Sequence, residues 1–162
     1  MYDKMLRGTL AVVAGAALLA GLSGVSVAQS SDPLIGTWKL NVAKSKFDPG
    51  PAPKSGGLKY EMIGQGLKVT VDTDGATGPA HWEYTANFDG KDYPVAGNPD
   101  GDMVALKRMT TTTTEAVIKK SGKTMTTNTR VVSADGKTLT ITAAGTNAKG
   151  QAVHNVQVYE KQ

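Results

Sequence analysis

The sequence predicts an all-β protein, an antiparallel up-and-down β-barrel of about eight to ten strands that is preceded by a signal peptide. Short alternations of apolar and polar residues, which are typical of half-buried strands, recur along the chain. Turn signals such as Asp89-Gly90 and Asp135-Gly136 separate these alternations. Long crossing connections are missing, which favours sequential hairpins, and closing such a sheet into a barrel removes its exposed edges.

The first 28 residues are typical of a secretory signal peptide. A positively charged start precedes an apolar run over residues 10–22, which is too short to span a bilayer, and small residues lead up to Ala28. We predict cleavage after Ala28, a lead-in over residues 29–34 and a barrel domain over residues 35–162. The mature protein is then expected in the periplasm or outside the cell, without a stable membrane anchor.

The composition of the mature chain excludes several classes of protein. About 134 residues remain after cleavage, which is enough for one domain with a buried core. Their net charge is about +3 and the lysines are scattered, so no nucleic-acid partner is predicted. The chain has no cysteine, which rules out disulfides, thiol catalysis and cysteine-based metal sites.

The opening strand is expected at residues 35–41, where Trp38 and Leu40 share one face. A Pro/Gly-rich connection over residues 42–57 follows, because proline at every second position resists both a helix and a central strand. Alternation then predicts the remaining strands, at 58–62, 67–71, 82–88, 103–109, 111–119, 123–132, 138–144 and 153–161. Longer loops are expected at 72–79 and 93–101, where glycine, proline and aspartate gather.

Two end motifs resemble a known group of barrels. Gly36-Thr37-Trp38-Lys39-Leu40 resembles the opening of fatty-acid-binding proteins, and its Gly-x-Trp is similar to the lipocalin signature. Val158-Tyr159-Glu160-Lys161 resembles the closing strand of the fatty-acid-binding type. Both families are calycins, so the resemblance implies a calycin-like, ligand-binding barrel. The chain also resembles bacterial exported lipocalin-like proteins of unassigned function.

Two departures from the fatty-acid-binding pattern bear on function. That family inserts two short helices as a lid after its first strand, where this chain has its proline-rich connection. It also holds a carboxylate with an Arg-x-Tyr pair in the last strand, where this chain reads Gln157-Val158-Tyr159. A neutral amide can hydrogen-bond a carboxylate but cannot neutralise it. We therefore expect a ligand held mainly by shape and apolar contact.

Six residues are candidates for contact with a ligand. Arg108 lies on one strand face with Val104 and Leu106, and Arg130 lies on one face with Val132, so inward-facing guanidinium groups would bind an anionic head group. The alternative is that both arginines lie at the rim or outside, since a register slip of one residue exchanges the faces. The other candidates are Tyr60, Tyr84, Gln157 and Tyr159.

Gly36 and Trp38 are predicted to be structural, with Trp38 filling the closed end of the barrel. The tyrosines, together with Trp82, have core packing as an alternative to lining a cavity.

No metal, cofactor or enzyme activity is predicted. His81 and His154 have no partner in register, and Asn98-x-Asp100-x-Asp102 lacks the glycine and distal glutamate of a calcium loop, which favours a polar hairpin loop. No pair of carboxylates and no Gly-x-Ser-x-Gly element suggests catalysis. The expected function is to bind or carry a small apolar or amphipathic molecule. The alternative is a periplasmic structural or protein-interaction module with a filled core and no ligand.

Overall fold

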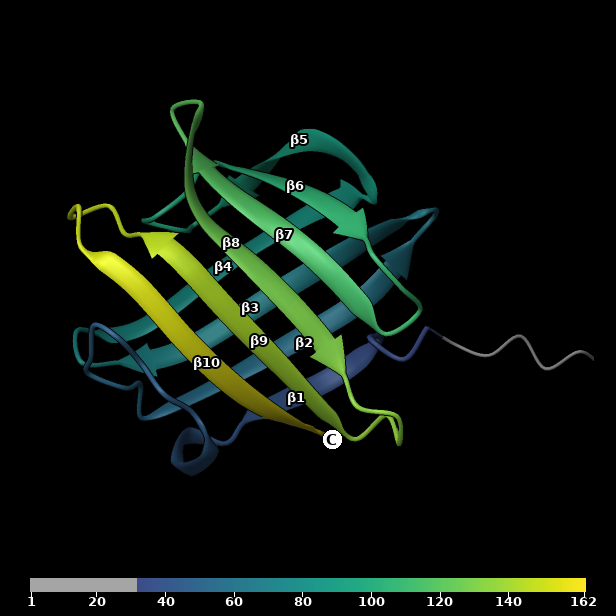
Figure 1. Ribbon diagram of the computed structural model, residues 1–162, viewed down its shortest axis with the longest axis horizontal. Coiled ribbons are helices and arrows are strands. Elements are labelled where there is room, and N and C mark those ends of the chain that lie inside the picture. Colours follow the sequence, from purple (N-terminus) through teal and green to yellow (C-terminus); the bar gives the residue numbers. More distant parts are fainter. Residues whose placement is uncertain (1–31) are drawn as a thin grey trace, which may run out of the picture.

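The computed structural model describes residues 32–162, which form one closed antiparallel barrel (Figure 1). The predicted signal peptide and the start of the lead-in lie outside the described residues. Each strand pairs with its neighbours in sequence, and β1 closes the barrel by pairing with both β2 and β10. The ten strands are β1 Gly36–Leu40, β2 Ser55–Ile63, β3 Gly66–Gly75, β4 Gly78–Asn87, β5 Asp89–Ala96, β6 Met103–Arg108, β7 Thr113–Lys120, β8 Lys123–Val132, β9 Thr138–Thr146 and β10 Ala152–Lys161. The predicted all-β, up-and-down barrel is therefore confirmed.

Two of the predicted loops are wrong. Gly75 pairs with Gly78, so the loop expected at 72–79 is a tight turn between two long strands. Most of the loop expected at 93–101 is divided between β5 and the turn after it. Pro94 is tolerated in β5 because this strand meets β4 at only two register pairs, where few ladder hydrogen bonds are lost. Similarly, β2 begins at Ser55, inside the expected connection.

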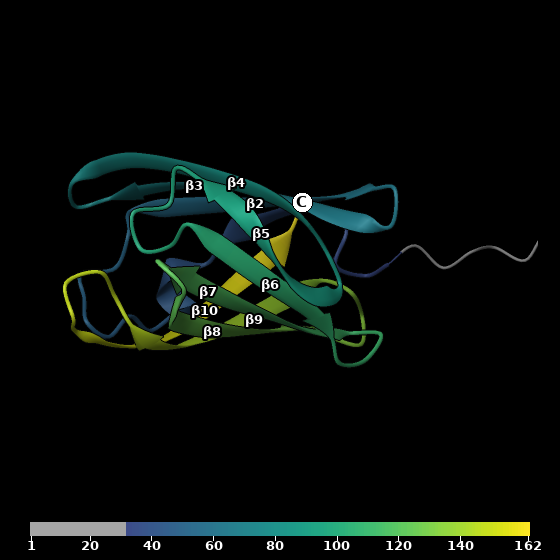
Figure 2. The same cartoon turned by 90° about the horizontal axis from the view of Figure 1, so that it is seen from above.

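The barrel is flattened, with β2, β3 and β4 in one wall and β7 to β10 in the wall opposite (Figure 2). Inward-facing aliphatic and aromatic side chains from both walls form the core. The only helical element among residues 32–162 is η1, a single 3-10 turn at Val42–Lys44, so no described helix is long and apolar enough to cross a membrane.

The closed end of the barrel is built around Trp38, which is 0% exposed. Its indole Nε1 donates a hydrogen bond of 2.9 Å to the carbonyl oxygen of Leu34. The ammonium of Lys161 lies 5.0 Å from the centre of the Trp38 ring, a cation–π distance. The same ammonium donates to the carbonyl oxygen of Pro33 at 3.0 Å. The lead-in is thereby fixed across this end.

A proline-rich segment covers part of the opposite end. We call residues 46–54 the strap. Its first residue, Lys46, forms an antiparallel bridge with Val156 of β10, with N···O distances of 2.7 and 2.9 Å. Asp48 accepts a hydrogen bond of 2.7 Å from the amide of His154. At its far end, Lys54 donates to the carbonyl oxygen of Asp74 at 2.7 Å. The strap therefore extends from β10 to β3.

Replacing Trp38 by alanine is expected to destabilise the protein on the order of 3–5 kcal/mol, because it empties the closed end of the barrel. Urea unfolding followed by circular dichroism measures the change. Trp82→Ala is the control, because the Trp82 ring is only partly buried and its loss should cost less. Equal losses in the two variants would contradict the role assigned to Trp38.

Candidate functional site

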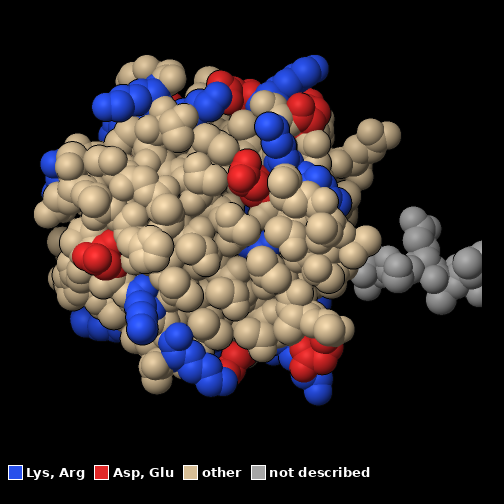
Figure 3. Space-filling view, in the orientation of Figure 1, with Lys and Arg blue, Asp and Glu red and all other residues tan. Residues whose placement is uncertain are grey.

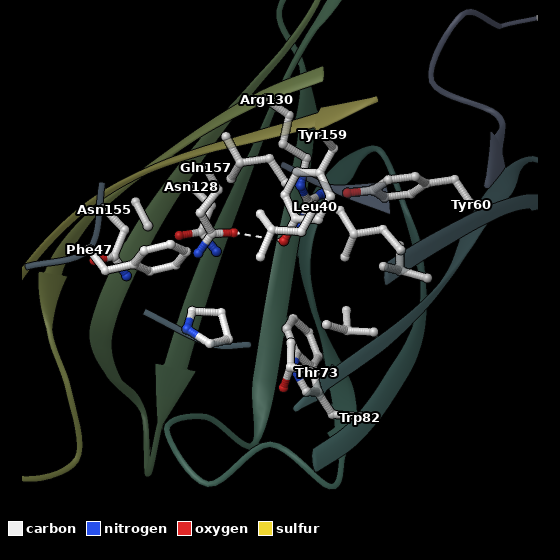
Figure 4. A pocket seen from close by; sticks show the side chains of 16 residues that line it. Leu40, Phe47, Tyr60, Thr73, Trp82, Asn128, Arg130, Asn155, Gln157 and Tyr159 are labelled. Atoms are coloured by element: carbon white, nitrogen blue, oxygen red, sulfur yellow. Dashed lines mark hydrogen bonds between the residues drawn. The ribbon is translucent and has the colours of Figure 1, made fainter. Parts of the chain in front are cut away.

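The barrel encloses a cavity of about 240 Å³ between the closed end and the strap (Figure 4). Its walls are mostly apolar, with a few polar groups from β8 and β10. The strap supplies Phe47 and Pro53, so it forms part of the cavity wall. The lining residues are Leu40, Phe47, Pro53, Leu58, Tyr60, Val69, Val71, Thr73, Trp82, Asn128, Arg130, Ile141, Ala143, Asn155, Gln157 and Tyr159.

Arg130 is the only charged residue in this lining, and it is 3% exposed. Its Nη2 donates a hydrogen bond of 2.8 Å to the hydroxyl oxygen of Tyr84. Its guanidinium carbon lies 5.7 Å from the ring centre of Tyr60, which allows a cation–π contact. Within residues 32–162, Arg130 forms no ion pair with a carboxylate.

Two nitrogens of Arg130, Nε and Nη1, are buried without a hydrogen-bond acceptor among the described residues. Buried polar groups are almost always paired, and a buried charge without a counter-charge is costly. The Arg130 side chain therefore offers two donors and a full positive charge that the described part of the chain does not neutralise.

The tyrosines around Arg130 remain protonated at neutral pH. Burial raises the pKa of Tyr60 to about 12, although the charge of Arg130 acts in the opposite direction. Burial also raises the pKa of Tyr159, again opposed by Arg130. Burial alone lowers the pKa of Arg130, but the attraction of Tyr60 and Tyr84 outweighs it and the pKa rises overall. The site is thus cationic at physiological pH, with neutral phenols beside the guanidinium.

Tyr159 and Gln157 both point to the cavity from β10 (Figure 4). The Tyr159 hydroxyl donates a hydrogen bond of 2.9 Å to Oε1 of Gln157. This bond occupies the amide oxygen and leaves the Gln157 amide nitrogen as a neutral donor. The positive charge of the site comes from Arg130 on β8, and the last strand contributes only neutral groups.

Strand register arranges the polar residues in two layers. Arg130 lies opposite Ile141, which lies opposite Gln157. One layer nearer the strap, Asn128 lies opposite Ala143, which lies opposite Asn155. Ala143 leaves space where a larger side chain would fill the barrel. Asn155 is fixed by the strap, because its Oδ1 accepts a hydrogen bond of 2.9 Å from the amide of Asp48.

A second region of about 320 Å³ continues from the cavity toward the loops. The two regions share Trp82, Asn128, Ala143 and Asn155. Loops contribute further polar lining at Asn98, Asp100 and Asn147. The cavity therefore leads from a cationic interior to a polar, partly open mouth.

The Asn98-x-Asp100-x-Asp102 segment joins loops instead of gathering ligands for a metal. Asp100 Oδ1 accepts a hydrogen bond of 2.8 Å from the amide of Ala148, and Asp102 Oδ2 accepts one of 2.9 Å from the amide of Ser121. The described residues contain no group of three or more His, Asp or Glu placed to hold a metal ion. His81 pairs with Asp72 at 2.7 Å on the exposed surface.

The structure gathers most of the predicted candidates at one site. Tyr60, Arg130, Gln157 and Tyr159 line the cavity. Tyr84 lies behind Arg130 and positions its guanidinium.

Arg108 lies elsewhere, at the closed end. Its guanidinium pairs with Asp32 of the lead-in and stacks 4.3 Å from the ring centre of Phe88. We therefore do not place Arg108 in the ligand site.

Among the lining residues that were not sequence-based candidates, three bear most on the chemistry of the site. Asn128 and Asn155 lie two residues from Arg130 and Gln157 on the same strands, so alternation places each pair on one face. That signal was available in the sequence. Phe47 was not detectable in this way, because it lies in a connection without periodicity and reaches the cavity only through the strap.

No protein-family model and no curated protein matches this chain. The closed barrel with sequential strand order is consistent with the calycin-like fold that the two end motifs imply.

Alkaline pH should destabilise the folded protein through Tyr60. The folded state holds the Tyr60 proton up to about pH 12, whereas the phenol has an ordinary pKa of 10.0. The stability associated with this proton is complete below pH 10 and is lost as the pH rises to about 12. Urea unfolding at increasing pH should show a steeper loss in the wild type than in Tyr60→Phe. Tyr93→Phe, at a tyrosine that is only partly buried, is the control, and identical curves for wild type and Tyr60→Phe would contradict the assignment.

Proposed function

We propose that this protein binds a small amphipathic ligand inside the barrel, with an anionic group of the ligand paired to Arg130. The observation that carries the proposal is the buried guanidinium in the cavity wall, with Nε and Nη1 unpartnered and no carboxylate within ion-pair distance among residues 32–162. A carboxylate presents two oxygens in a geometry that the planar guanidinium fork matches.

The energetics favour an anion over a neutral ligand. A buried charge without a partner costs several kcal/mol, even after the surroundings relax. A bound anion recovers part of that cost through two charge-assisted hydrogen bonds, each about twice as strong as a neutral one. Tyr84 and the ring of Tyr60 hold the guanidinium in place before the ligand arrives, which lowers the entropy cost of binding.

The size of the cavity limits the ligand. A cavity of roughly 150 Å³ can hold a benzene ring, so a volume of about 240 Å³ has room for a small molecule. Leu58, Val69 and Ile141 supply apolar walls for the body of the ligand. A short aliphatic or single-ring acid fits these dimensions, and a long acyl chain does not fit unless it extends into the second region. The proposed ligand therefore differs from the fatty acid that the resemblance of the end motifs implies.

The predicted signal peptide supports ligand carriage outside the cytoplasm. The alternative function, a structural or interaction module with a filled core, has less support because the described interior leaves a cavity around a charged side chain. We propose that the strap and the loops around Asn98 and Asn147 form the route by which the ligand enters.

Arg130→Met tests the proposal by removing the charge and keeping a long side chain. We expect affinity for hexanoate or benzoate to fall about 10- to 100-fold, since bonds to a charged group contribute ~1.5–3 kcal/mol. Isothermal titration calorimetry measures this change. The melting temperature should stay level or rise, because the variant no longer buries an uncompensated charge.

Arg108→Met is the matched control, since Arg108 pairs with Asp32 away from the cavity. It should retain wild-type affinity for both acids. The proposal fails if neither acid binds the wild type, or if the two arginine variants lose affinity equally.

A further inference from the structure

We propose that the ligand is a hydroxylated acid, whose hydroxyl group donates a hydrogen bond to Asn128 while its carboxylate pairs with Arg130. This inference rests on the proposed function and specifies the chemical class of ligand for the same site. It follows from a second unpartnered polar group in the cavity wall.

Oδ1 of Asn128 is buried and has no hydrogen-bond donor among the described residues. Asn128 lines both the cavity and the region that leads to the mouth, so any molecule that extends from Arg130 toward the mouth passes it (Figure 4). An unsatisfied buried carbonyl costs ~1–3 kcal/mol, which a donor on the ligand recovers. A plain hydrocarbon at this level would leave the oxygen unpaired.

The neighbours of Asn128 do not supply that donor. Across the ladders, Asn128 lies opposite Ala116 on β7 and Ala143 on β9, and neither side chain carries a polar group. Asn155, the next inward residue in the layer, is oriented by its bond to the strap.

Strand geometry sets the spacing of the two groups on the ligand. Asn128 and Arg130 are two residues apart on the same face of β8, about 7 Å along the strand. The donor of the ligand therefore lies several bonds from its carboxylate, across a ring or a short chain. An acid with a hydroxyl group next to the carboxylate would hold both groups in the Arg130 layer and leave Asn128 unpaired.

The ends of the cavity agree with this polarity. Beyond Asn128, the mouth carries Asn98, Asp100, Asn147 and Asn155. An acid with a purely apolar tail would place that tail among amides and a carboxylate. A hydroxyl group at the far end of the ligand meets hydrogen-bond acceptors at Asn128 and at the mouth. The cavity is therefore polar both at Arg130, where the carboxylate lies, and near the mouth, where the hydroxyl group lies.

The test compares matched pairs of acids by calorimetry. The pairs are benzoate with para-hydroxybenzoate, and hexanoate with its terminal hydroxy derivative. In the wild type, the hydroxylated member of at least one pair should bind about tenfold more tightly, the effect of one hydrogen bond to a buried acceptor. In Asn128→Val, that preference should fall below about twofold, while affinity for the plain acid stays close to the wild-type value.

Thr126→Val is the control, because Thr126 lines the outer region and not the cavity around Arg130. It should keep the preference for the hydroxylated acid. Valine suits a strand at both positions, and melting temperatures confirm that the variants are folded.

The outcomes separate the two proposals. If the plain acids bind in an Arg130-dependent way and the hydroxyl group adds nothing, the hydroxylated-acid inference is wrong and the proposed function stands. A preference that survives in Asn128→Val also overturns the inference. If no acid of either pair binds the wild type, both proposals fail together.

Discussion

The buried positive charge of Arg130 is the constraint on which the interpretation of this barrel depends. The guanidinium is held by the hydroxyl of Tyr84 and the ring of Tyr60, and within the described residues no carboxylate balances it. A buried charge without a carboxylate as counter-ion is costly, so fold stability does not explain this side chain. Its position in a cavity wall is instead the arrangement expected where a protein gives up stability to recognise an anion.

In the rest of the barrel, the packed and paired groups lie at the two ends, away from the interior around Arg130. At the closed end, Trp38, Leu34 and Lys161 form a packed cluster, and Arg108 is paired with Asp32. The other end is covered by the strap, whose backbone is bound to β10 and β3. Between the two ends, the short side chain of Ala143 leaves the interior open. The two cationic arginines consequently differ in role: the charge of Arg108 is neutralised by the chain, and that of Arg130 is not.

The sequence predicted the architecture more fully than the site. Alternation and turn residues were sufficient for the order of the strands, and the end motifs placed Trp38 and Tyr159. Arg130 could be proposed but not assigned to a face, because one residue of slip turns a side chain from the interior to the surface. Arg108 shares its strand face with buried residues, which favoured an interior position. Its partner Asp32 lies 76 positions away in the sequence, so no periodic pattern could predict the ion pair. Phe47 reaches the cavity only because the strap crosses the barrel. Long-range closure of this kind is not encoded in local patterns.

The most direct measurement is the ¹H–¹⁵N NMR signal of the Arg130 Nε–H group during titration with benzoate, assigned by its absence in Arg130→Met. An Nε–H without an acceptor that gains a carboxylate oxygen should shift downfield in a saturable way, while the Nε–H signal of Arg108 stays in place. This result is the one that an anion site at Arg130 predicts. A signal for Arg130 that stays unchanged at saturating benzoate would contradict the account.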